Sequence, residues 1–125
     1  METIRLNARA RNQLMTLKRR TGIGNWNVLC RWALSTSLAE DHPPRDISVS
    51  GEAAIEMTWR TFGGEYADVY LGLLKQYCLK SGLDVHDTAT LNEQLKKHLY
   101  RGIGYLASRK ETQSIEELVV LSTSR

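Results

Sequence analysis

Polar and apolar residues alternate at the start of the chain and then change to a helical period. Thr3-Ile4-Arg5-Leu6 shows the period of two that is typical of a strand. The next apolar positions share one face of a helix and are Ala10, Leu14 and Leu17. Asn7 is a favoured N-cap and Gly22 a favoured C-terminal stop. The pattern therefore predicts a short strand followed by a helix over residues 7–21.

A second helix is predicted over residues 26–38, and apolar side chains cover most of its circumference. One face holds Trp26, Leu29, Cys30 and Ala33, and Val28 and Trp32 point almost the opposite way. A helix of this kind is buried on several sides, either as a central helix or at a subunit interface. Strand, helix, turn and helix is the order of a ribbon-helix-helix DNA-binding unit. Because that unit needs a second copy to complete its two-stranded ribbon, the interface is favoured.

The rest of the chain alternates between chain breaks and helical patterns. His42-Pro43-Pro44-Arg45-Asp46 ends the first unit, because proline cannot continue a helix. Strand-like alternation follows at Ile47, Val49, Ile55, Met57 and Trp59. A helix is predicted over residues 65–80. Two further helices are predicted to begin at capping boxes, one formed by Thr90 with Glu93 and one by Ser114 with Glu117. We therefore expect a mainly α fold: a single small domain over 1–125 of about five helices with a short N-terminal strand. Its 1–40 unit would be ribbon-helix-helix-like and its 41–125 remainder helical.

Positive charge is concentrated in the first forty residues. The only acidic residues there are Glu2 and Glu40, so this segment has an excess of five positive charges in a chain of formal net charge +3. Such a patch attracts polyanions. An ordinary solvated helix surface mixes signs, and no acid occurs from Thr3 to Ser37. The predicted DNA-binding residues are Arg5, Arg9, Arg11, Lys18, Arg19, Arg20 and Arg31.

The sequence gives little support for enzyme chemistry, so we expect no catalytic residue, no metal site and no cofactor. There is no phosphate-cradling loop, and His42, His86 and His98 lack metal-ligand spacing. Two pairs of acids are suggestive: Glu65 with Asp68, one helical turn apart, and Asp84 with Asp87, on either side of His86. Helix-dipole and loop roles explain these acids more simply. The two cysteines, Cys30 and Cys78, lie in apolar helical patterns and are expected to be buried thiols.

Composition and targeting signals point to a folded cytoplasmic protein. The chain has 125 residues, of which 42% are hydrophobic and 25% charged, close to globular averages. No apolar run approaches the roughly 20 residues of a membrane span. The charged N-terminus lacks the apolar core of a signal peptide. We therefore expect neither a membrane partner nor export.

Three stretches carry a family resemblance. They are residues 19–34 (RRTGIGNWNVLCRWAL), 59–66 (WRTFGGEY) and 98–106 (HLYRGIGYL). With the chain length, they resemble the DndE family, the small subunit of bacterial DNA sulfur-modification (phosphorothioation) systems. The resemblance implies a helical homo-oligomer, a dimer or tetramer, that acts on duplex DNA. It also implies a cysteine desulfurase, an iron–sulfur protein and an ATPase-like protein as partners.

Three kinds of function stay open on the sequence. The charge asymmetry favours a non-catalytic subunit that binds duplex DNA through phosphates. Such a subunit would prefer nicked DNA if the interrupted backbone lowers the cost of bending. The alternative is a metal-dependent DNA nickase that opens the backbone for sulfur incorporation, with the four suggestive acids as its only candidates. The third is a scaffold that binds the desulfurase and never touches DNA.

Overall fold

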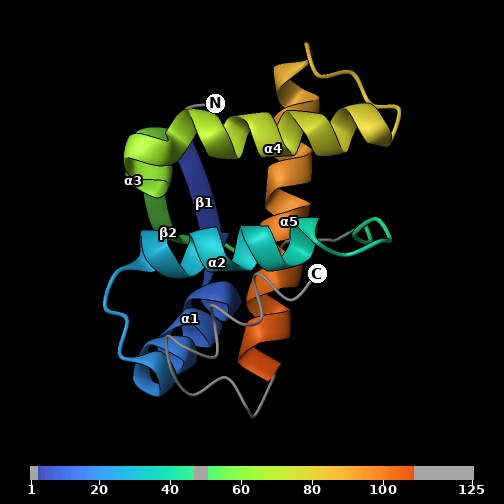
Figure 1. Ribbon diagram of the computed structural model, residues 1–125. Coiled ribbons are helices and arrows are strands. Elements are labelled where there is room, and N and C mark those ends of the chain that lie inside the picture. The colour runs from blue at the N-terminus through green and yellow to red at the C-terminus, as the bar shows by residue number, and fades with distance from the viewer. Residues whose placement is uncertain (1–2, 47–50, 109–125) are drawn as a thin grey trace.

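The arrangement of the elements is set by one long helix, α5 (Thr88–Ser108). The computed structural model describes residues 3–46 and 51–108. The other elements are β1 (Thr3–Asn7), α1 (Ala8–Thr21), α2 (Trp26–Leu38), β2 (Ala53–Thr58), α3 (Trp59–Gly63), the 3-10 turn η1 (Gly64–Tyr66) and α4 (Ala67–Lys80). Figure 1 shows α2 and α4 crossing α5, with the two strands between α1 and α3. The fold is mainly helical with a short N-terminal strand, as predicted, and that strand belongs to a two-stranded sheet.

Helix α1 begins and ends where local signals predict. The Asn7 side chain caps α1 by accepting a hydrogen bond from the Ala10 amide at 3.0 Å. Gly22 ends α1 in the left-handed region, with φ of 76°, and its amide donates to the Lys18 carbonyl at 2.9 Å. Glycine adopts this conformation without a steric penalty. The predicted bounds of α1 are therefore confirmed, and α2 spans the residues predicted for it.

The strand β1 pairs with a strand of its own chain. It lies antiparallel to β2, with Ile4 opposite Met57 and Leu6 opposite Ile55. These four side chains are buried, and the residues between them are exposed or half-buried. In a ribbon-helix-helix protein the second strand would come from another copy. Because β2 takes that position here, the expected need for a second copy to complete the ribbon is wrong for this chain.

Helix α2 is the central helix of the core. Leu29, Cys30, Ala33 and Leu34 are fully buried, and Trp32 is half-buried against the same core. The main partner of α2 is α5. At the crossing, Gly102 lies so close to α2 that a Cβ there would come within 1.9 Å of the Ala33 carbonyl oxygen. Of the two predicted alternatives, a central helix or a subunit interface, the central position therefore explains most of the apolar surface of α2.

Two predicted boundaries differ from the structure. Trp59 does not extend the β2 strand but begins α3, because the Thr58 hydroxyl accepts a hydrogen bond from the Thr61 amide at 3.0 Å and caps this helix. Helix α5 begins at Thr88, before the predicted capping box. The Asp87 carboxylate accepts from the Ala89 amide and the Thr90 hydroxyl, both at 3.0 Å. Asp87, and not Thr90, is thus the residue that caps α5.

Some of the remaining predictions are confirmed, and others concern residues that the structure does not describe. The helix predicted over 65–80 is observed as η1 followed by α4. The predicted strand residues Ile47 and Val49 and the helix of the Ser114 capping box lie outside the described residues. Both cysteines are buried free thiols, as predicted. Among the described residues, no helix is long and apolar enough to cross a membrane.

Candidate nucleic-acid interface

Helix α1 presents cations to solvent and carries no acidic residue. Its apolar side, which includes Ala10, Leu14 and Leu17, is buried in the core. Arg9, Arg11 and Arg19 are exposed. Its last turn holds Lys18, Arg19 and Arg20, where cations also favour the helix dipole. The helix therefore combines a structural role for its C-terminal charges with a basic surface along its length.

Several of the predicted DNA-binding residues have partners within the protein. Arg5 donates to the Glu56 carboxylate at 3.1 Å across the β1–β2 ribbon, and both side chains are largely exposed. The Lys18 ammonium lies 4.5 Å from the centroid of the Trp26 ring. Exposed pairs of this kind contribute little stability and remain open to water and ligands. Arg5 and Lys18 therefore stay near the surface as cations.

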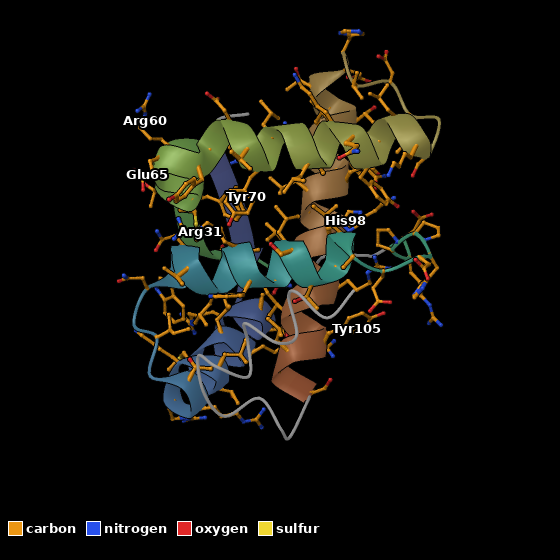
Figure 2. The ribbon with its side chains drawn as sticks, viewed as in Figure 1. Arg31, Arg60, Glu65, Tyr70, His98 and Tyr105 are labelled. Atoms are coloured by element: carbon orange, nitrogen blue, oxygen red, sulfur yellow. The ribbon has the colours of Figure 1, made fainter. Side chains whose placement is uncertain are left out.

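Two of the predicted residues join elements of the fold. Arg20 donates to the Ala107 carbonyl of α5 at 2.8 Å, and Arg31 donates to the Phe62 carbonyl of α3 at 3.0 Å. Figure 2 shows Arg31 between α2 and α3, with Arg60 on the outside of α3. The structure thus spreads the seven predicted cations over β1, α1 and α2 and does not gather them into one site.

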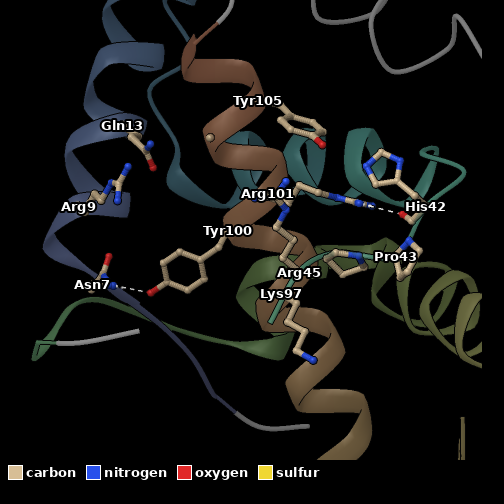
Figure 3. A pocket seen from close by; sticks show the side chains of 12 residues that line it. Asn7, Arg9, Gln13, His42, Pro43, Arg45, Lys97, Tyr100, Arg101 and Tyr105 are labelled. Atoms are coloured by element: carbon tan, nitrogen blue, oxygen red, sulfur yellow. Dashed lines mark hydrogen bonds between the residues drawn. The ribbon is translucent and has the colours of Figure 1, made fainter. Parts of the chain in front are cut away.

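A cavity of about 560 Å³ lies between α1, residues 42–45 and α5 (Figure 3). We call it the basic cavity. Four cations line it, and no Asp or Glu does: Arg9, Arg45, Lys97 and Arg101. The other lining residues are Asn7, Gln13, His42, Pro43, Pro44, Tyr100, Gly104 and Tyr105. Only Arg9 among the predicted DNA-binding residues contributes to this cavity.

Arg101 is fixed in the wall of the basic cavity by neutral groups. Its Nε donates to Ser37 Oγ at 2.8 Å, its Nη2 to the Ser37 carbonyl at 2.7 Å, and its Nη1 to the His42 carbonyl at 2.9 Å. None of these acceptors carries a charge. The guanidinium is therefore held in place while its positive charge stays available to a ligand.

The same network continues to a buried histidine. Ser37 Oγ lies 2.7 Å from His98 Nδ1, and because Arg101 can only donate, Ser37 accepts from Arg101 and donates to His98. Burial lowers the pKa of His98 to about 4, and the charge of Arg101 adds to this effect. His98 is consequently neutral at physiological pH. It supports Arg101 without adding charge.

Lys97 differs from the arginines of the basic cavity because it is paired with carboxylates, and Tyr100 is held by a backbone amide. The Lys97 ammonium lies 2.6 Å from an Asp46 oxygen and 3.2 Å from a Glu93 oxygen. The hydrogen bond to Asp46 raises the pKa of Lys97. The Tyr100 hydroxyl accepts from the Asn7 amide at 2.9 Å, and its pKa is raised by burial. Tyr100 thereby joins the β1–α1 junction to α5.

Three cations of the basic cavity were not predicted as site residues from the sequence. Arg45 follows a pair of prolines, and Lys97 and Arg101 belong to the part of the chain with a negative balance. One signal was present, since residues 97, 101 and 105 share a helix face at a spacing of four. The convergence of that face with Arg9 depends on the tertiary packing of α1 against α5.

The acids considered for a nickase are not gathered together. Glu65 is exposed in η1, and Asp68 is exposed in the first turn of α4. Asp84 accepts from the His86 amide, and Asp87 caps α5. Within residues 3–46 and 51–108, no three His, Cys, Asp or Glu side chains are grouped as metal ligands. Burial raises the pKa of the Cys30 thiol to about 12, so this thiol is not a nucleophile at neutral pH.

The family comparison and the structural comparison agree with each other. Residues 3–114 match the family described as DNA sulphur modification protein DndE. The fold is similar to a crystal structure of a DndE mutant described as involved in DNA phosphorothioation. The TM-score is 0.61 at 17% identity, covering 84% of this chain and 97% of that chain. Among curated proteins, no sequence matches.

Proposed function

Because the chain belongs to the DndE family of DNA sulphur modification proteins, we propose that it serves DNA phosphorothioation as a non-catalytic subunit that binds duplex DNA. The observation that carries this proposal is the basic surface of α1, a helix with exposed arginines and no acid. Phosphate oxygens accept bidentate hydrogen bonds from arginine, and each neutralised phosphate releases counterions. Binding of this kind is independent of base sequence and weakens with salt.

The predicted DNA-binding residues would contribute unequally. Arg9 and Arg11 are exposed, and no ion pair among the described residues involves them. Arg5, Lys18 and Arg19 are accessible but have weak partners at the surface. Arg20 and Arg31 each use a guanidinium N–H to hold a backbone carbonyl. We therefore place the main phosphate contacts at Arg9 and Arg11, with smaller contributions from the other five.

The preferred substrate would be duplex DNA with an interrupted strand. Smoothly bending an intact site costs of order 1–6 kcal/mol, and a nick lowers that cost without any base contact. A nick also exposes a strand end to the arginines. Competition between nicked and intact duplexes of one sequence and length measures this preference. Equal competition at physiological salt would contradict a preference for nicked DNA.

The subunit would act as a dimer or tetramer in the cytoplasm. The other proteins of such a system, the desulfurase, the iron–sulfur protein and the ATPase-like protein, would be its further partners. An exposed apolar row on one side of the α4 region supports an assembly, since large exposed apolar patches mark interaction surfaces. Tyr66, Val69 and Leu73 form this row and are 56%, 57% and 43% exposed. Sedimentation of the wild type at micromolar concentration tests the assembly, and a monomer would contradict it.

A salt titration of duplex binding tests the proposed function. Contact with about four to six phosphates gives a slope of order −4 to −5 in a plot of log affinity against log salt concentration. The same binding reaction with magnesium, followed by product analysis, addresses the nickase alternative. New nicks in an intact duplex would favour the nickase. Affinity that hardly changes with salt would contradict binding through phosphates, and no duplex binding at any salt concentration would leave the scaffold alternative.

A further inference from the structure

We propose that the basic cavity binds a phosphate monoester on a nucleoside, such as the terminal phosphate of a DNA strand. The cavity lies beside Arg9, where the α1 surface meets α5. In naming a strand end as the ligand, this inference rests on the proposed function. A free nucleotide presents the same chemistry, and the experiment below separates the two sources.

The charge of the basic cavity suits a doubly charged anion. None of the ion pairs among the described residues involves Arg9, Arg45 or Arg101. Lys97 is paired with two carboxylates and adds no net positive charge, so the positive charge of the cavity comes from the three arginines. A phosphate monoester carries about −1.5 to −2 at pH 7, whereas a phosphodiester within a strand carries a single charge. The cavity therefore favours the monoester.

The shape of the basic cavity suits more than a phosphate. Its volume of about 560 Å³ is within the range of small-molecule sites. Tyr105, Pro43 and Pro44 supply apolar wall area for a sugar or a base, and the Arg101 guanidinium lies 5.9 Å from the Tyr105 ring centroid. A group that projects from a strand end can enter such a concave site. A phosphodiester with both neighbours attached is hindered from doing so.

Part of the basic cavity is already organised for binding. Arg101 is held by three hydrogen bonds to Ser37 and His42. Tyr100 is held by the Asn7 amide. Groups fixed before binding lose little conformational entropy when the ligand arrives. Arg9 and Arg45 are exposed at the rim and are free to turn toward the phosphate.

The test compares strand ends that differ only in their phosphate. The probes are a short single-stranded oligodeoxythymidylate with a 5′-phosphate, the same strand with a 5′-hydroxyl, and free thymidine monophosphate with thymidine as its control. Binding to the full chain is measured by fluorescence competition. We expect the phosphorylated strand to bind about tenfold more tightly than the hydroxyl strand, as one additional charge-assisted contact would give. Tighter binding of the free nucleotide than of the strand would show that the phosphate monoester comes from a free nucleotide and not from a strand end.

Matched variants connect the effect to the basic cavity. The double variant Arg9→Gln, Arg45→Gln should abolish the preference for the phosphorylated end. Arg11→Gln removes the same charge from the same helix but does not line the cavity, so it should weaken both strands equally. Since neither rim arginine has an ion pair within the described residues, thermal unfolding of the double variant should match the wild type. Arg45→Lys, which keeps the charge, should retain most of the preference.

The outcomes separate this inference from the proposed function. Salt-dependent duplex binding without any preference for a phosphorylated end overturns the cavity site and leaves DNA binding intact. A preference that survives in the double variant also overturns it. Binding of thymidine monophosphate that depends on Arg9 and Arg45, with no duplex binding at all, supports the cavity site and removes the proposed function.

Discussion

The α2–α5 crossing and the basic cavity share helix α5 but differ in how they treat polar and charged groups. At the crossing, Gly102 meets the Ala33 backbone and fully buried side chains surround the contact. Around the basic cavity, three arginines keep their charge without a carboxylate partner. One face of α5 therefore packs into the core, and the other face, together with α1 and residues 42–45, holds positive charge that no carboxylate balances. Uncompensated cations at a concave surface are typical of a binding site.

The largest expected effect is at the crossing itself. A Cβ at Gly102 would lie 1.9 Å from the Ala33 carbonyl oxygen, and neither backbone can move without displacing the core. We expect Gly102→Ala to lower the free energy of unfolding by about 3 kcal/mol or more. Urea denaturation followed by circular dichroism measures this change.

Gly104 on the same helix is the matched control. A Cβ there meets nothing within 4 Å. Gly104→Ala should therefore raise stability by about 0.5–1 kcal/mol through the better helix propensity of alanine. Equal destabilisation by the two substitutions would show that the crossing is not the sensitive contact.

The second effect is a pH dependence that arises beneath the basic cavity. The folded-state pKa of His98 is about 4, below its ordinary value of 6.5, so the unfolded chain binds the proton more tightly. The contribution of neutral His98 to stability is complete above pH 6.5 and is lost as the pH falls toward 4. We expect the wild type to lose up to about 3 kcal/mol more than His98→Asn between pH 7 and pH 4. Denaturation curves of both proteins across this range test the difference, and parallel pH profiles would contradict it.

The third effect separates two arginines of the basic cavity. Arg101→Met removes the hydrogen bonds to Ser37 Oγ, to the Ser37 carbonyl, which keeps the Glu40 amide as a donor, and to the His42 carbonyl. We expect a loss of about 1–3 kcal/mol in stability. Arg45→Gln removes an exposed side chain that has no ion pair in the described part of the chain, so its effect should stay within about 0.5 kcal/mol. Thermal unfolding compares the two variants. A large loss of stability for Arg45→Gln would show that Arg45 helps to hold the fold together.

The smallest expected effects distinguish predicted DNA-binding residues from one another. Arg9→Gln should reduce the salt slope of DNA binding by about 1 and leave unfolding unchanged. Arg31→Gln loses the bond to the Phe62 carbonyl, so it should cost about 1 kcal/mol of stability and change the slope less. Titrations of both variants on one duplex, with thermal unfolding alongside, decide the assignment. If Arg31→Gln reduced the salt slope and Arg9→Gln reduced stability, the DNA interface would lie on α2 and not on α1.

Features with local causes were predictable from the sequence, and features that depend on distant residues were not. Asn7 and Gly22 act on backbone groups within four residues, so the bounds of α1 followed from the sequence. The pairing of β1 with β2 could not be predicted, because β2 lies about fifty residues away in the sequence and the residues of one strand do not identify the strand that pairs with it. Three sequence stretches resembled the family, and the distribution of charge pointed to basic residues on α1. The sequence could not show that Arg31 would point toward α3, or that Arg45 and Arg101 would converge on Arg9.

The location of the main α2 partner has a consequence for synthesis. Helix α2 packs chiefly against α5, which the ribosome makes last among the described elements. Until residues 88–108 have emerged, the apolar surface of α2 has no cover, and β1 has no partner before residues 53–58 are made. The N-terminal forty residues therefore cannot complete their own core during translation. A nascent chain stopped before α5 should recruit chaperones and be degraded readily by proteases, whereas one that extends beyond Ser108 should resist them.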